Sequence, residues 1–156
     1  MDRIFFDTPA GRLGLEAEGE VLTALYLPNQ CAGMTPGNAT PLLERGRAQL
    51  LEYLRGERRT FQLPLAPRGT PFQQLVWKLL LDIPYGEVVS YRELALRTGR
   101  PRGCRAVGQA NRRNPLPILI PCHRVTAADG SLGGYAGGLE LKQYLLRLEE
   151  SNCGKT

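Results

Sequence analysis

The sequence contains few of the residues that most often bind metals. Histidine occurs once, at position 123, and the four cysteines are far apart, with no C-x-x-C pair. Structural zinc sites need four cysteine or histidine ligands at close spacing, so no metal or other cofactor is expected. Four widely separated cysteines favour free thiols in a reducing compartment over disulfides. The four are Cys31, Cys104, Cys122 and Cys153.

Long apolar runs are also absent. No stretch is long enough to span a bilayer, and the opening Met-Asp-Arg-Ile-Phe-Phe-Asp lacks the apolar core of a signal peptide. We therefore expect a cytoplasmic protein that does not enter a membrane. Apolar residues make up 42% of the 156 residues, which suits one ordinary domain or two small lobes.

Acidic residues are missing from one long stretch. Between Leu94 and Ala128 there are seven arginines and no aspartate or glutamate, and the whole chain carries a net charge of +5. A basic surface of this kind attracts phosphate backbones. A solvated basic face without a particular partner has the same composition, so charge alone leaves both interpretations open.

The first 65 residues predict a small α/β lobe. Alternating apolar residues indicate three antiparallel strands, with turns at Gly11 and around Gly19. A helix follows, with Thr40 as its N-cap and Gly56 at its end. No residue pattern in this lobe indicates chemistry, so we expect it to support the rest. The expected elements are strands over 3–7, 12–17, 21–27 and 61–65, a loop over 28–40 and a helix over 41–54.

From residue 66 onward the chain predicts a mainly helical lobe. Two capping boxes, at 70–73 and 90–93, each indicate the start of a helix. A glycine-containing turn separates the second helix from a third, and two short helices joined in this way form a helix-turn-helix pattern. The three predicted helices cover about 71–82, 91–98 and 101–112.

The third of these helices is the most informative. Arg102, Arg105, Gln109 and Arg112 are separated by steps of three, four and three residues, which places them on one side of a helix. Its opposite side, with Cys104, Val107 and Gly108, is expected to pack inward. An exposed basic helix without a partner is the alternative. The DNA-binding interpretation is favoured because the turn pattern and the acid-free arginine stripe agree.

Cys122 and His123 stand side by side after a proline-rich run, residues 114–121. The thiolate of cysteine is a strong nucleophile near neutral pH, and a neighbouring base can generate it. A buried structural cysteine beside a chance histidine is the simpler interpretation of the pair alone. The surrounding motifs favour the nucleophile.

The last predicted helix covers residues 139–149. Leu141, Tyr144, Leu145 and Leu148 are expected on its apolar face, with Glu149 at the edge of that face. Glu149 is expected either to face His123 or to be solvated, and the sequence leaves both open. Before this helix, residues 133–138 form a glycine-rich loop around Tyr135 that matches no phosphate-binding fingerprint.

The stretch from Pro71 to Glu149 resembles the catalytic half of the O6-alkylguanine-DNA alkyltransferases. Together with the lobes that the residue patterns predict, the resemblance implies an α+β fold with an N-terminal lobe over 1–65 and a DNA-binding, alkyl-accepting lobe over 66–156. The segments that carry it are Thr-Pro-Phe-Gln-Gln-Leu-Val-Trp (70–77), Ile-Pro-Tyr-Gly-Glu-Val-Val-Ser-Tyr (83–91), Arg-Ala-Val-Gly-Gln-Ala-Asn (105–111), Asn-Pro-Leu-Pro-Ile-Leu-Ile-Pro-Cys-His-Arg-Val (114–125) and Gly-Gly-Tyr-Ala-Gly-Gly-Leu (133–139).

The resemblance implies direct DNA repair. A damaged guanine is flipped out of the duplex, and a cysteine takes the alkyl group from O6 in a reaction that each molecule performs once. By position, Cys122 is the acceptor, His123 takes its proton through a water, and Glu149 orients His123. Asn114 belongs to the same hydrogen-bond network.

The resemblance also assigns residues to DNA. By position, Tyr91 crowds the target phosphate, Arg105 fills the gap in the base stack, and Tyr135 donates a hydrogen bond to the flipped base. The expected partner is double-stranded DNA containing O6-alkylguanine, bound in the minor groove by a monomeric protein.

Two other functions remain as alternatives. A non-catalytic helix-turn-helix sensor or regulator needs the helix pair but not the Cys122–His123 pair, and its relatives within the family carry tryptophan in place of the cysteine. A Cys-His hydrolase needs an oxyanion hole and not the arginine stripe. Ala136 occupies a position at which certain relatives have serine, which removes one possible hydrogen bond to the base.

Overall fold

The chain separates after Arg68 into two units in the computed structural model, which describes residues 1–153. The sequence places a boundary after residue 65, within the irregular segment that precedes the second unit. The first unit combines an antiparallel sheet with one helix, and the second is mainly helical, so the chain has an α+β fold.

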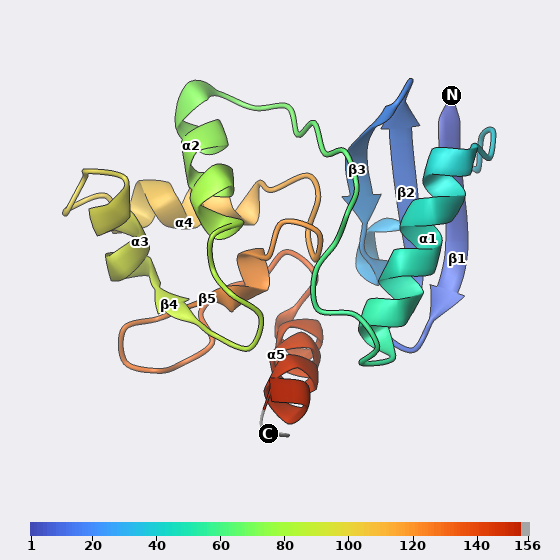
Figure 1. Cartoon of the computed structure of the whole chain (residues 1–156). Coiled ribbons are helices and arrows are strands. Elements are labelled where there is room, and N and C mark those ends of the chain that lie inside the picture. Colours follow the sequence, from blue (N-terminus) through green and yellow to red (C-terminus); the bar gives the residue numbers. More distant parts are fainter. Residues whose placement is uncertain (154–156) are drawn as a thin grey trace. The chain divides into compact units, whose positions relative to one another are not determined.

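The first unit contains a three-stranded antiparallel meander in the order β1-β2-β3 (Figure 1). The hairpins are tight: Thr8 pairs with Gly11, and Glu18 pairs with Val21. Gly11 and Gly19 have φ values of 107° and 58°, a region that glycine enters at little cost. The three predicted strands are therefore confirmed. Their bounds are β1 Asp2–Thr8, β2 Gly11–Glu18 and β3 Val21–Tyr26, followed by a 3₁₀ turn, η1, at Pro28–Gln30.

Helix α1 (Pro41–Leu54) covers one face of this sheet. The hydroxyl of Thr40 accepts a hydrogen bond from the Leu43 amide at 3.2 Å, which is the predicted N-cap. Gly46 faces the sheet, and a Cβ atom there would stand 2.9 Å from the Leu15 side chain, so the helix and sheet pack closely.

The predicted strand over 61–65 is wrong. Leu65 forms a single isolated bridge with Leu22, and the remaining residues are irregular. Leu22 donates to the carbonyl of Pro64 at 2.8 Å, but Pro64 has no N–H with which to continue a ladder.

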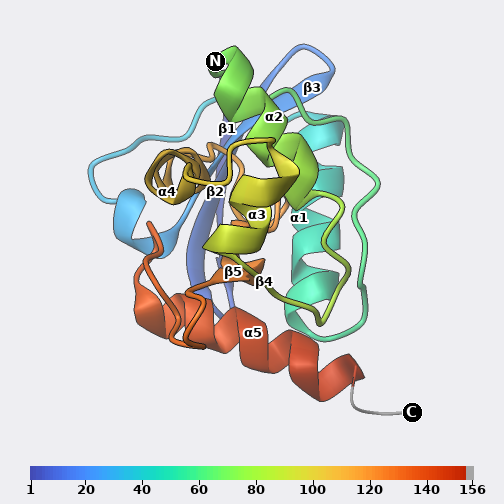
Figure 2. The same ribbon diagram turned by 90° about the vertical axis from the view of Figure 1, so that its left-hand side faces the viewer.

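The second unit is built on three helices that contact one another (Figure 2). Thr70 and Gln73 form the predicted capping box, and the Trp77 indole donates to the Ala110 carbonyl at 2.8 Å, which ties the first helix to the third. Gly99, at φ 80°, lies in the turn between the second and third helices. The helices are α2 Pro71–Leu80, α3 Tyr91–Arg97 and α4 Cys104–Arg112.

Two short strands, a 3₁₀ turn and a last helix also belong to the second unit. Strands β4 (Val89–Ser90) and β5 (Val125–Thr126) pair in parallel, which the sequence did not predict because each has only two residues. A 3₁₀ turn, η2 (Cys122–Arg124), directly precedes β5. The last helix, α5, runs from Leu139 to Cys153, one turn beyond its predicted end.

Candidate active site

The proline-rich run before Cys122 folds into a turn held by Asn114. The Asn114 amide donates to the Ile120 carbonyl at 2.8 Å, and its oxygen accepts from the Leu116 amide at 2.9 Å. Ile118, at the bend, has a φ of 73°, which costs energy for a β-branched residue. The side chain of Asn114 therefore holds both ends of a strained turn that leads directly to the cysteine.

Cys122 begins η2 and is buried. Asn111, on α4, donates from its amide to the Cys122 carbonyl at 3.2 Å, which connects the cysteine to the helix-turn-helix. Burial raises the pKa of the Cys122 thiol to about 11, while Asn114 and Lys142 oppose this shift. The resting residue is therefore a thiol at neutral pH.

His123 and Glu149 form a buried pair. His123 Nε2 lies 2.6 Å from Glu149 Oε2, and both side chains are almost fully enclosed. Burial lowers the pKa of His123, although Glu149 acts in the opposite direction. Burial by itself would raise the pKa of Glu149, but the hydrogen bonds and charges of His123 and Arg124 outweigh it and lower that pKa to about 2. Of the two options left open by the sequence, Glu149 therefore faces His123.

Arg124 is a member of this cluster that sequence reasoning missed. Its Nε donates to Glu149 Oε1 at 2.8 Å, and a terminal nitrogen donates to Oε2 at 3.0 Å. Another terminal nitrogen donates to the Ile83 carbonyl at 2.7 Å, and Gly86 N–H donates to Glu149 at 3.1 Å. Arg124 is buried, so its inclusion in an exposed basic surface was wrong. A buried glutamate needs a cationic or hydrogen-bonding partner. This requirement was the available signal for a role of Arg124 beside Glu149.

Lys142 was also missed. It is fully buried on α5, and its ammonium group donates to three backbone carbonyls. Lys142 lies seven residues before Glu149, so two helical turns place both on one face. The predicted apolar face is therefore displaced, because the inward side of α5 carries Lys142, Leu145 and Glu149.

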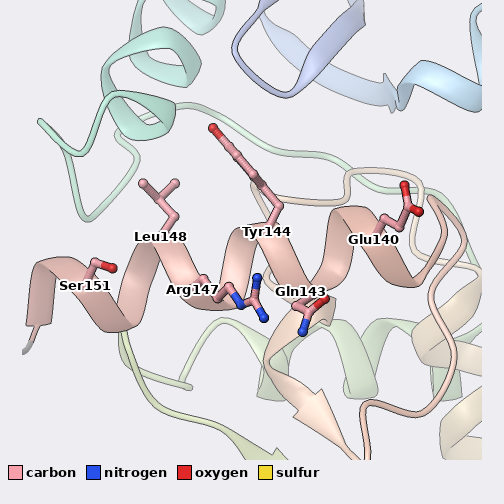
Figure 3. Close-up of a pocket in the computed structure, with 6 residues that line it drawn as sticks. All are labelled: Glu140, Gln143, Tyr144, Arg147, Leu148 and Ser151. Atoms are coloured by element: carbon pink, nitrogen blue, oxygen red, sulfur yellow. The ribbon is translucent and has the colours of Figure 1, made fainter.

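The opposite side of α5 lines a pocket (Figure 3). Tyr144, which was predicted to face inward, is 37% exposed there, and no predicted catalytic residue lines this pocket. The α5 residues of the pocket are Glu140, Gln143, Tyr144, Arg147, Leu148 and Ser151.

The glycine-rich loop carries Tyr135 and is contacted by Tyr91. The Tyr91 hydroxyl donates to the Gly134 carbonyl at 3.4 Å. The Tyr135 hydroxyl is buried and has no hydrogen-bond partner among the residues that the structure describes. Burial, with the nearby Cys122 and Glu149 contributing, raises the pKa of Tyr135 well above its usual value, so the phenol keeps its proton as a donor.

Helix α4 presents Arg105, Gln109 and Arg112 on its exposed side. Arg102 is exposed but precedes the helix, so the prediction of a helix from Pro101 was wrong. The Gly103 amide instead closes a turn on the Arg100 carbonyl at 2.8 Å, and the helix begins at Cys104. Cys104 is exposed, and the inward side of the helix carries Val107, Ala110 and Asn111.

Fold and site together define a helix-turn-helix protein whose buried Cys-His-Glu cluster is connected to α4 through Asn111. A family model described as "6-O-methylguanine DNA methyltransferase, DNA binding domain" matches residues 71–151. The chain belongs to this family, as the resemblance implied.

Full-length comparisons agree. The constitutive methylated-DNA–protein-cysteine methyltransferase of Bacillus subtilis is 46% identical over 151 residues, which cover 92% of each chain. The enzyme of the same name from Mycobacterium tuberculosis H37Rv is 47% identical over 150 residues, covering 94% of this chain and 91% of that protein. The crystal structure of Mycobacterium tuberculosis OGT in complex with DNA has a TM-score of 0.89 at 44% identity, covering 97% of this chain and 94% of that one. Within residues 1–153, every helix is too short or too polar to span a bilayer.

Proposed function

We propose that the protein repairs DNA directly, by transferring a methyl or other alkyl group from O6 of a flipped guanine in duplex DNA to Cys122. The carbon–sulfur bond forms as the carbon–O6 bond breaks, and guanine is the leaving group. The resulting thioether leaves no free thiol, so each molecule reacts once. The arrangement of Cys122 beside the buried His123–Glu149 pair is the observation that carries this proposal.

The cluster supplies the base that a protonated thiol needs. Because the pKa of Cys122 is about 11, attack requires removal of the thiol proton. His123 has a lowered pKa and is neutral near pH 7, and its Nε2 is engaged with the ionised Glu149. Its Nδ1 then takes the thiol proton through a water, and Glu149 stabilises the imidazolium that forms. Arg124 and Gly86 hold Glu149 in place for this role.

The remaining site residues are proposed to act on the DNA. Arg105 fills the gap left by the flipped base, Tyr91 crowds the target phosphate, and Arg102, Gln109 and Arg112 contact the duplex. The phenol of Tyr135 donates to the departing guanine, which favours its release as a neutral base. These roles are supported by the exposure of Arg102, Arg105, Gln109 and Arg112, and by the Tyr135 hydroxyl, which has no partner among residues 1–153.

The non-catalytic sensor is not favoured, because it leaves the Cys122, His123 and Glu149 cluster unexplained. Mass spectrometry of the intact protein, after incubation with duplex DNA that carries O6-methylguanine, separates the two. We expect the wild type to gain one methyl group on the peptide that contains Cys122, and Cys122→Ala to gain none. DNA binding without any mass gain would favour the sensor.

We also infer that the protein is a cytoplasmic monomer in which the second unit binds DNA and accepts the alkyl group. All four cysteines, each within the described residues, are free thiols, which suits a reducing compartment. The cysteine, its base and the helix-turn-helix all belong to that second unit.

A further inference from the structure

Lys142 forms a buried cation site whose ligands are all backbone carbonyls. Its Nζ donates to Val125 O at 2.6 Å, to Gly134 O at 3.1 Å and to Leu132 O. An ammonium group has three protons to donate, and three acceptors converge on it here. Burying a charge is costly unless hydrogen bonds compensate for it. Displacing any of the three carbonyls would therefore cost free energy.

The three carbonyls belong to two segments that matter for the chemistry. Val125 directly follows η2, three residues after Cys122. Gly134 belongs to the glycine-rich loop and directly precedes Tyr135, and Leu132 directly precedes that loop. One ammonium group therefore joins the backbone that carries the nucleophile to the backbone that carries the phenol.

Tyr91 and Arg112 also confine this loop. The Tyr91 hydroxyl donates to the Gly134 carbonyl, which also accepts from Lys142. A Cβ atom on Gly133 would stand 2.8 Å from the Tyr91 ring, and one on Gly134 would stand 2.6 Å from the Arg112 guanidinium. The loop therefore has little freedom to shift while Lys142 holds it.

We propose that Lys142 is a positioning residue for alkyl transfer, which fixes the separation between Cys122 and the Tyr135 loop by binding both segments. The inference rests on the proposed function, because it assigns the loop to the flipped guanine. Displacement at carbon needs the sulfur, the carbon and the leaving oxygen in line, and a misplacement of about 1 Å can reduce such a rate about 100-fold.

A purely electrostatic role makes a different prediction. The positive charge of Lys142 favours the Cys122 thiolate, so a charge effect would change the reactivity of that thiol toward any electrophile. Positioning changes only the reaction with the bound guanine. A small alkylating reagent, iodoacetamide, distinguishes the two because it does not use the Tyr135 loop.

The first test is Lys142→Met, which keeps a similar length and removes all three donors. We expect the single-turnover rate on O6-methylguanine duplex at saturating protein to fall about 10- to 100-fold. The affinity for undamaged duplex should stay within about threefold. The rate of Cys122 with iodoacetamide should fall much less than the transfer rate, because only the loss of the Lys142 charge affects it. A parallel fall in the iodoacetamide rate, or an unchanged transfer rate, overturns the proposal.

The second test asks whether Lys142 acts through Tyr135. We expect Lys142→Met to cost much less in a Tyr135→Phe background than in the wild type, because coupled residues give non-additive effects. Full multiplication of the two losses contradicts the proposal. A wild type that transfers no methyl group contradicts the proposed function itself, which is a separate outcome.

Lys142→Arg keeps the inference testable if the methionine variant does not fold. Arginine retains the charge, but its planar fork cannot converge on three carbonyls as an ammonium does. We expect the transfer rate to fall in this variant while iodoacetamide reactivity is preserved. Full wild-type transfer in Lys142→Arg shows that charge alone is sufficient and overturns the positioning role.

Discussion

The reacting residue rests in its less reactive form. Burial keeps Cys122 protonated, with a pKa of about 11, and keeps His123 neutral by lowering its pKa. A neutral base and a protonated nucleophile avoid placing an unpaired charge in a dry site. In the proposed mechanism, charge develops on Cys122 and His123 only during the reaction, and Glu149 lies in place to stabilise the imidazolium.

The pH profile of alkyl transfer follows from this arrangement. His123 accepts a proton only in its neutral form, and burial moves its pKa below the usual 6.5. We expect a transfer rate that is flat from about pH 8 down to about 6.5 and falls only in more acidic solution. Single-turnover rates on O6-methylguanine duplex give the profile, with circular dichroism confirming the fold at each pH. A midpoint above pH 6.5 would contradict the assignment of His123.

Glu149 should also make stability depend on pH. Its folded pKa is about 2 against a reference value of 4.5, so its contribution is present above about pH 4.5 and is lost as the pH falls toward 2. We expect Glu149→Gln to lower the free energy of unfolding at pH 7 by about 3 kcal/mol, because it leaves Arg124 buried without its counter-charge. Urea denaturation at pH 7 and pH 3 should show a smaller pH effect in the variant.

Glu150 provides the matched control for this experiment. It is the next residue on α5, and it is exposed. Glu150→Gln should change the free energy of unfolding by no more than about 0.5 kcal/mol at either pH. Equal losses in the two variants would mean that the buried cluster does not contribute specifically.

At the scale of elements, α4 packs through one side against the rest of the second unit and exposes a polar side. Trp77 binds its Ala110 carbonyl, and Val107 and Ala110 are buried, while Arg105, Gln109 and Arg112 are exposed. A rigid helix with exposed arginines can contact phosphates without rearrangement, so DNA affinity should depend strongly on salt.

Removing one of these arginines should weaken the salt dependence. For Arg112→Ala we expect the slope of log affinity against log salt concentration to fall by about 1, with lower affinity for all duplex sequences. Arg45, an exposed arginine on α1, is the matched control, and Arg45→Ala should leave the slope unchanged. Equal slopes for Arg112→Ala and the wild type would remove Arg112 from the DNA interface.

The elements were predicted best where their signals are local. Thr40, Thr70 and Ser90 each cap a helix through a bond to an amide three residues later, and the sequence indicates all three. The start of α4 was missed because proline suits either a first helical turn or a tight turn. The structure forms the tight turn, which the Gly103 amide closes on the Arg100 carbonyl.

At the scale of the whole molecule, repair should change stability. The Cys122 side chain lies in a packed interior with 4% of its surface exposed. A methyl group added to its sulfur overpacks this site, which typically costs about 1–3 kcal/mol. We expect the melting temperature to fall by roughly 3–10 °C after reaction with O6-methylguanine duplex.

Thermal denaturation before and after the reaction measures this effect, with intact mass confirming that the methyl group is present. Cys122→Ala treated in the same way should show no shift, because it cannot be alkylated. An unchanged or higher melting temperature for the methylated protein would mean that the site has room for the added group.

The sequence by itself determined the hairpins, the capped helices, the helix-turn-helix and the identity of Cys122 and His123, because each depends on residues close together in the chain. Tertiary structure decided what surrounds them. Arg124 lies in a basic stretch and Lys142 lies in a helix that also carries Glu140 and Arg147, so their sequence context indicates solvent. Both are buried because Glu149 and a ring of backbone carbonyls provide acceptors from distant segments. Burial of a charge depends on partners brought together by folding, and local sequence does not contain that information.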